Sequence, residues 1–92
     1  PQILTGAGAV NITAAITTIV STGTDALTLI DGIAGQLKFI TMVTYGGVAT
    51  LTPTTLNGFT TITFNSDGDS CTLLFVTTHG WCVVGAHGAT IA

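Results

Sequence analysis

Short runs of threonine and branched or aromatic apolar residues follow one another along the chain, each ended by glycine, asparagine or aspartate. Such residues are enriched in β-strands, and turn residues at these short intervals are typical of an all-β domain. No long stretch repeats its apolar residues every 3.6 positions, as an amphipathic helix would. The pattern predicts strands over Thr17–Thr22, Ala26–Leu29, Gln36–Thr44, Val48–Thr52, Thr60–Phe64, Ser70–Val76, Trp81–Gly85 and Ala89–Ile91.

The longest predicted strand, Gln36–Thr44, is apolar on both faces. Leu37, Phe39, Thr41 and Val43 share one face, while Lys38, Ile40, Met42 and Thr44 share the other. A strand exposed on one side alternates apolar and polar residues, whereas a strand covered on both sides does not. We therefore expect this strand to be covered on both faces.

The first sixteen residues differ from the rest, with small residues, two glycines and no charge. They predict either an edge strand with loops or an arm that adds to a neighbouring subunit. Residues 17–92 are expected to form the domain itself. The predicted fold is all-β, a compact antiparallel β-sandwich or barrel.

Charge is scarce: 5% of the 92 residues are charged, with Lys38 as the only cation, four aspartates and twenty threonines. A typical globular domain has about 25% charged residues, and a surface this neutral favours association. One lysine cannot neutralise phosphates, so the sequence argues against binding to nucleic acid or to an anionic membrane. No apolar run approaches the ~20 residues that cross a bilayer.

One stretch, Gly68-Asp69-Ser70, spells a hydrolase motif. A catalytic serine requires a base, an orienting carboxylate and oxyanion donors, often at a strand–turn–helix junction. Here Ser70 begins a predicted strand and no helix follows, so a turn is the better interpretation. We expect no enzyme activity and no catalytic residue.

Metal and cofactor binding have weak signals. Asn65, Asp67, Asp69 and Ser70 could offer oxygen ligands to calcium, but the chain has no glutamate. His79 and Cys82, with His87, lack the close ligand pairs of zinc sites. No metal and no cofactor are therefore expected.

Two cysteines, Cys71 and Cys82, fall too far apart in the predicted hairpin for a disulfide. Both are expected to be buried free thiols, as in a protein kept in a reducing cytosol. Trp81 is predicted to be a core or interface anchor. It could also form a stacking platform for a sugar, as could Tyr45 or Phe59.

The region Asp25–Gly85 resembles small β-rich virion structural proteins of tailed bacteriophages. The recurring elements are a "DG-x-x-G-Q" turn, "GG-x-A-TLTP", "NG-x-TTITF", "GDS-x-TLLF" and a terminal "W-x-V-x-G". In this chain they correspond to Asp31–Gln36, Gly46–Pro53, Asn57–Phe64, Gly68–Phe75 and Trp81–Gly85.

The resemblance implies a virion protein made in the host cytoplasm, most often a homotrimer, whose partners are further copies of itself and the major capsid protein. The favoured role is a capsid decoration (cement) protein that stabilises the head shell through apolar contacts. The alternative is a tail fibre or spike module, or a receptor-binding tip that contacts host glycans. Because Pro1 is an end that removal of an initiator methionine would leave, a complete small protein is expected, with a domain of a larger chain as the other possibility. The candidate contact residues are Ile3, Leu4, Val10, Ile12 and Trp81.

Overall fold

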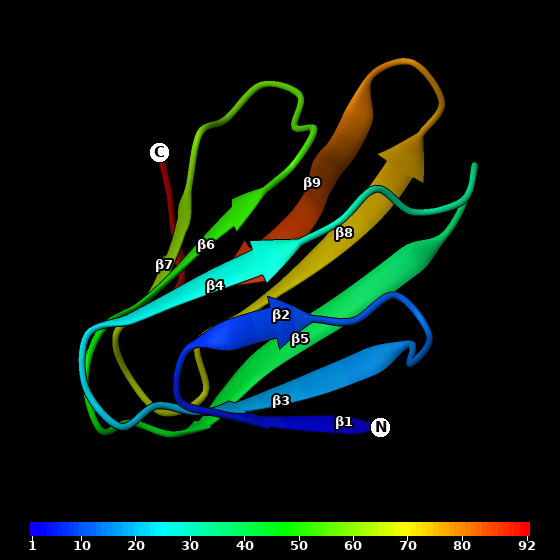
Figure 1. Ribbon diagram of the computed structural model, residues 1–92. Coiled ribbons are helices and arrows are strands. Elements are labelled where there is room, and N and C mark those ends of the chain that lie inside the picture. The colour runs from blue at the N-terminus through cyan, green and yellow to red at the C-terminus, as the bar shows by residue number, and fades with distance from the viewer.

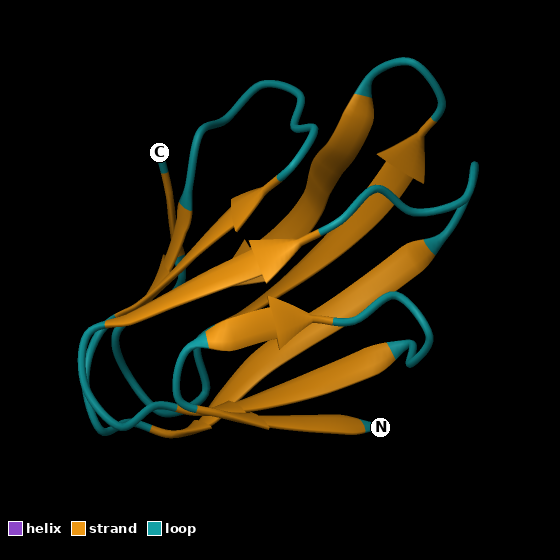
Figure 2. Cartoon of the chain, viewed as in Figure 1, coloured by secondary structure: helices purple, strands orange, loops and turns teal.

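The computed structural model describes residues 1–92 and contains ten strands and no helix (Figures 1 and 2). The all-β prediction is confirmed. The strands are β1 (Gln2–Thr5), β2 (Gly8–Val10), β3 (Ile16–Val20), β4 (Asp25–Leu29), β5 (Leu37–Thr44), β6 (Ala49–Pro53), β7 (Ile62–Phe64), β8 (Ser70–Val76), β9 (Gly80–His87) and β10 (Thr90–Ile91).

The strands form two five-stranded sheets that pack on one another. The first, here called sheet A, has the order β1-β3-β5-β8-β9, and the second, sheet B, has the order β10-β7-β6-β4-β2. In Figure 1 the strands β2, β4 and β6 of sheet B lie in front of β3, β5 and β8 of sheet A. Residues 1–16 contribute an edge strand to each sheet, β1 to sheet A and β2 to sheet B.

The N-terminal half of the chain winds between the two sheets three times. β1 leads to β2, β3 to β4, and β5 to β6, and each step passes from sheet A to sheet B. Successive passes stack in parallel, so that Leu4 pairs with Ile19 and Ile19 with Met42 on one side of the core. On the other side Leu27 pairs with Leu51. Each pass therefore adds one strand to each sheet.

The prediction of an antiparallel fold is wrong for this half. The pairs β1–β3, β3–β5, β2–β4 and β4–β6 are all parallel. The glycines that end these strands suggested reversals within one sheet, but they form corners between the layers. When the chain crosses to the other sheet and then returns, the returning strand runs parallel to the strand that it left.

The corner after β5 is held by the hydroxyl of Ser21. This Oγ donates a hydrogen bond to the carbonyl oxygen of Gly47 at 2.7 Å and accepts one from the N–H of Gly46 at 2.8 Å. A Cβ atom at either glycine would overlap the backbone of the corner beneath, at Ser21 or Gly23. Glycine is therefore needed where these two corners stack.

The C-terminal half is antiparallel, as predicted. β7 pairs with β6, β8 with β5, β9 with β8, and β10 with β7. The loop between β6 and β7 crosses to the other sheet, where Trp81 donates its N–H to Thr55 O and accepts from the N–H of Asn57, both at 3.0 Å. This loop closes one end of the space between the sheets.

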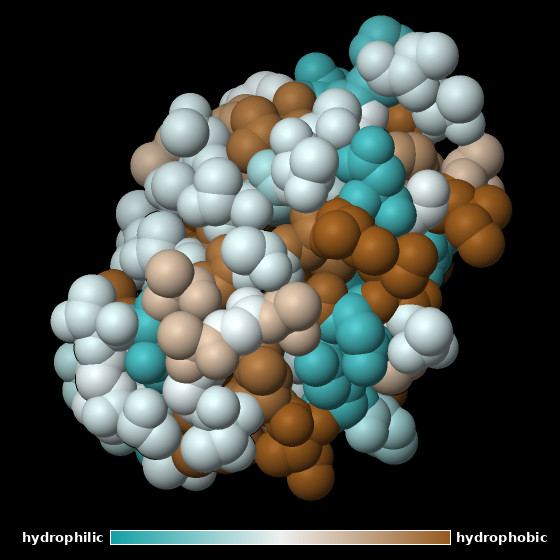
Figure 3. All heavy atoms as spheres, viewed as in Figure 1, coloured by the Kyte–Doolittle hydropathy of each residue, from teal (hydrophilic) through white to brown (hydrophobic).

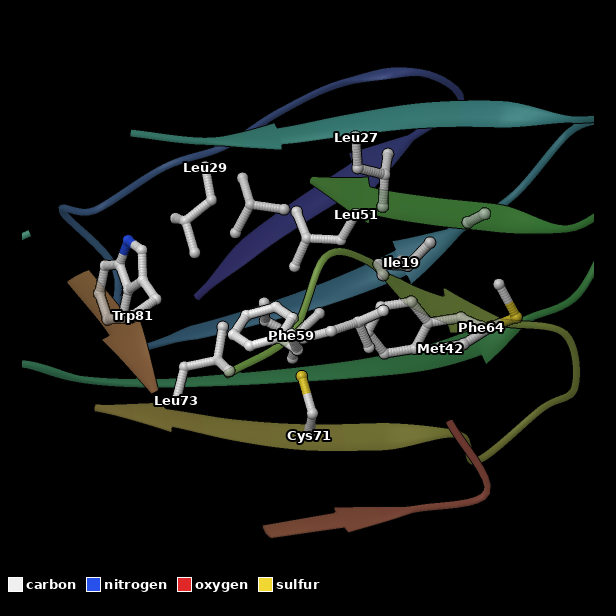
Figure 4. Close-up of a cluster of buried hydrophobic side chains, with 14 of the residues drawn as sticks. Ile19, Leu27, Leu29, Met42, Leu51, Phe59, Phe64, Cys71, Leu73 and Trp81 are labelled. Atoms are coloured by element: carbon white, nitrogen blue, oxygen red, sulfur yellow. The ribbon is translucent and has the colours of Figure 1, made fainter. Parts of the chain in front are cut away.

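The core is a single cluster of side chains from both sheets. Figure 4 shows Leu27, Leu29 and Leu51 of sheet B facing Met42 and Leu73 of sheet A. The inward residues recur at every second position of each strand, as the period of a β-strand requires. Burial of this apolar surface is the main source of stability.

Lys38, the only cation, points inward from β5 and is fully buried. Its Nζ donates a single hydrogen bond, to the carbonyl oxygen of Ala14 at 2.6 Å, which holds the loop that joins β2 to β3. Burial disfavours the charged amine and lowers the pKa of Lys38 below 10.5. A lone buried charge lowers the stability of the fold.

We expect the free energy of unfolding of Lys38→Met at pH 7 to exceed that of the natural chain by about 1 kcal/mol. The variant should therefore unfold at a higher urea concentration. Because the pKa of Lys38 is lower in the folded chain, the unfolded chain binds more protons between that lowered value and 10.5. The free energy of unfolding of the natural chain therefore rises with pH across this window. Urea titrations from neutral pH to 10.5 should show the advantage of Lys38→Met shrinking, and a constant difference would contradict the assignment.

Candidate interaction surface

The outer face of sheet A carries a row of apolar side chains that are exposed or only half-buried. Leu37 and Phe39 of β5 point outward and are 45% and 42% exposed. Phe39 pairs with Ile16 of β3, and Leu37 pairs with Leu74 of β8, which in turn pairs with Cys82 of β9. We call Ile16, Leu37, Phe39, Leu74 and Cys82 the apolar patch.

Further exposed apolar residues extend this face. Val43 lies on the same side of β5, Ile3 lies on the edge strand β1, and Val84 lies at a β-bulge opposite β8. The sequence predicted that β5 is covered on both faces, and a single chain covers only one of them. Large exposed apolar patches are commonly contact sites, so the outer face of sheet A is the candidate interaction surface.

The outer face of sheet B has a different chemistry. Its outward positions are threonine or alanine, and in register across the sheet they are Ala9, Ala26, Thr28, Thr50, Thr52 and Thr63. In Figure 3, pale spheres of intermediate hydropathy dominate this side of the molecule. Threonine hydroxyls can bond to water, so this face suits solvent and the face of sheet A suits a partner.

The five predicted contact residues fall in different environments. Ile3 is 73% exposed on β1, whereas Leu4 and Ile12 are half-buried against the core. Val10 and Trp81 are enclosed by the chain itself, with 1% and 0% of their surface exposed. In this fold only Ile3 among the five presents most of its side chain to a partner, and its role in a contact stays a prediction.

Trp81 fills the end of the core near the loops. Its Nε1–H donates to the carbonyl oxygen of Ile30 at 2.9 Å, and its ring meets Phe75 edge to face at 5.2 Å between centroids. Phe59, the second residue considered as a sugar platform, is also buried. Tyr45 is the one of the three whose ring is open to solvent, at 47% exposure.

The residues of the hydrolase motif do not form a catalytic arrangement. Ser70 begins β8 and lies opposite Gly88, next to His87, but no hydrogen bond joins its hydroxyl to either histidine. The carboxylate of Asp69 is buried, and its Oδ2 accepts the N–H of Asn65 at 2.9 Å. Asp69 thus closes the turn that precedes β8, as the sequence indicated for this stretch.

The residues that the sequence analysis weighed as calcium or transition-metal ligands do not form a metal-binding cluster. No group of three histidine, cysteine, aspartate or glutamate side chains lies close enough to hold a metal ion. Asp67 Oδ1 accepts the N–H of Tyr45 at 2.7 Å, while Asp69 turns into the fold. The two carboxylates of this loop bond to different parts of the backbone.

The two cysteines are free, as predicted, but only Cys71 is buried. Cys71 points into the core opposite Ala86, and burial raises the pKa of its thiol to about 12. Cys82 is half-buried on the opposite face of sheet A, in the apolar patch. Cys71 of β8 faces the core, whereas Cys82 of β9 lies opposite Leu74, which faces outward. The two sulfur atoms therefore lie on different sides of the sheet.

Neither a family model nor any curated protein matches this chain. The chain also has no helix long and apolar enough to cross a membrane. The apolar patch is the surface with the most distinctive chemistry.

Proposed function

We propose that this chain is a structural protein of a phage virion that assembles as a homotrimer through the outer face of sheet A and decorates the capsid. The observation that carries the proposal is the exposed apolar patch centred on strand β5 of sheet A, in a chain with only 5% charged residues. The resemblance of Asp25–Gly85 to virion proteins is the basis for proposing a virion location and a trimeric state. The patch supports burial against another protein surface.

The size of the molecule fits this role. A standard protein interface buries about 800 Å² on each partner, about a fifth of the 4431 Å² that this chain exposes. Apolar burial contributes about 25 cal/mol per Å², and much of it is offset by the entropy lost on association. A cement protein can rely on many modest contacts, because symmetry repeats each contact over the shell.

A tail fibre or spike module is the second candidate. Its support is the stack of three parallel passes in residues 2–53, since such a stack can be lengthened by adding further passes. The location of the chain in the native particle separates the two roles. Cryo-electron microscopy should show many copies over the head shell for decoration, and a few copies at the tail for the fibre.

We expect Phe39→Asp to weaken self-association about 30-fold or more, because loss of a central aromatic anchor commonly costs at least 2 kcal/mol at an interface. Sedimentation velocity over a range of concentrations measures the effect. The substitution is on an outward position, so circular dichroism should show an unchanged β-sheet spectrum.

Thr28→Asp provides the matched control, since it adds the same charge to the outer face of sheet B. We expect this variant to assemble as the natural chain does. If the two variants assemble equally well, the face of sheet A is not the interface. If the natural chain is a stable monomer at micromolar concentration, the trimer proposal fails.

A further inference from the structure

A shallow, open depression of about 290 Å³ lies where β5 ends, away from the apolar patch. It is lined by Tyr45, which follows β5, and by Asn65, Ser66 and Asp67 of the loop between β7 and β8. We call these four residues the Tyr45 pocket. Three of the four residues are polar and one is aromatic, so several hydrogen-bonding groups lie beside a single aromatic ring.

The loop that forms one wall of this pocket is fixed to β5. Gly68 donates its N–H to Met42 O at 2.7 Å, and Met42 donates its own N–H to Asp69 O at 2.8 Å. The hydrogen bond from Tyr45 N–H to Asp67 Oδ1 ties the two walls together. Because these bonds exist without a ligand, little ordering entropy would be lost when one binds.

The side chains of Asn65 and Ser66, and the second carboxylate oxygen of Asp67, are free to bond to a ligand. Asn65, Ser66 and Asp67 are exposed, and the side chains of Asn65 and Ser66 make no hydrogen bond within the chain. An amide and a hydroxyl each donate and accept, and a carboxylate accepts, so together they match hydroxyl groups. The exposed ring of Tyr45 adds an apolar, electron-rich face that can pack against C–H groups.

Charge narrows the class of ligand further. The chain has a net charge of −3, its only lysine is buried in the core, and no basic residue lines the pocket to pair with a phosphate, sulfate or carboxylate. A quaternary ammonium ion is enclosed by several aromatic rings, whereas the Tyr45 pocket has one ring beside a single carboxylate. The pocket is therefore not suited to such a cation. A neutral molecule with many hydroxyl groups and one apolar face fits best.

We infer that the Tyr45 pocket binds a neutral pyranose sugar, with the sugar ring stacked on Tyr45 and its hydroxyl groups bonded to Asn65, Ser66 and Asp67. None of these four residues belongs to the apolar patch. Sugar binding can therefore fail while the assembly proposal stands, and the reverse also holds. In an assembled particle, many weak sites of this kind would act together.

Titration of the ¹⁵N-labelled protein with glucose, galactose and N-acetylglucosamine, followed by amide chemical shifts, tests this inference. We expect shifts confined to Tyr45, Asn65, Ser66 and Asp67 with at least one sugar, and a dissociation constant on the order of millimolar. Glucuronate, which has a similar ring with a negative charge, should bind about tenfold more weakly or not at all.

Variants of Tyr45 separate stacking from a structural role. Tyr45→Ala should weaken binding about tenfold or more, while Tyr45→Phe, which keeps the ring, should bind within about threefold of the natural chain. Both variants keep the backbone N–H that holds Asp67. Thr52→Ala, on the outer face of sheet B, is the matched control. The inference is overturned if no sugar shifts these amides at about 100 mM, if Tyr45→Ala binds as well as the natural chain, or if only choline binds.

Discussion

Replacing Trp81 with alanine is expected to lower the free energy of unfolding by about 4 kcal/mol, a large part of what a domain of this size has. The ring is fully buried, and its Nε1–H satisfies the carbonyl oxygen of Ile30. It also packs beneath the turn at Gly32, where an added Cβ would come within 2.8 Å of the indole. Loss of the ring would leave a cavity where three separate segments meet.

Urea unfolding followed by circular dichroism measures this effect. Trp81→Phe should lose less, about 1–2 kcal/mol, since it keeps an aromatic ring against Phe75 and loses mainly the hydrogen bond and some volume. Val84→Ala, at an exposed position of the same strand, should change the stability by less than about 0.5 kcal/mol. A loss below about 1 kcal/mol for Trp81→Ala would show that the ring is not part of the core.

The eight strands from β3 to β10 could be predicted from the sequence because each alternates inward apolar residues between clear turn residues, whereas no range was predicted for β1 or β2. β8 occupies Ser70–Val76, the range expected from the sequence. The direction of pairing was not readable in the N-terminal half. Gly23 and the Gly46–Gly47 pair carry the same local signal whether the chain reverses within a sheet or turns a corner to the other layer. Only the packing of the whole chain decides between the two.

The faces of β5 illustrate what a pattern can and cannot reveal. Its apolar residues on both sides predicted two covered faces, and the structure covers only the face of Ile40 and Met42. Lys38 shares that face because residues two positions apart on a strand point to the same side of the sheet. The sequence thus showed that both faces of β5 are apolar without showing which face the chain covers and which it leaves exposed.

Single residues of the candidate sites were harder to predict. Val10 and Trp81 are apolar in the same way as Ile3, and only the fold separates the buried pair from the exposed residue. The sequence named Tyr45 as a possible sugar platform and Asp67 as a possible metal ligand, twenty-two positions apart. Their juxtaposition depends on the hydrogen bond between them and on the pairing of β8 with β5.

Gly47→Ala is expected to destabilise the fold by about 3 kcal/mol or more. Its φ of +155° is a conformation that residues with a side chain rarely adopt. An added Cβ would also overlap the carbonyl group of Gly23 in the corner beneath. The Cβ position is fixed by the backbone of residue 47, and the atoms that it meets belong to the backbone of Gly23. No rotation of a side chain can therefore relieve the overlap. The corner would have to open, which would also strain the hydrogen bonds of Ser21 that hold it.

Gly23→Ala is the matched control, because a Cβ at that position meets nothing within 4 Å. It removes a glycine from the same pair of stacked corners, and a compatible glycine-to-alanine change tends to stabilise by about 0.4–1 kcal/mol. Thermal unfolding of the two variants should therefore move in opposite directions. Equal midpoints would mean that the corners do not stack closely and that the three passes are held by their strands alone.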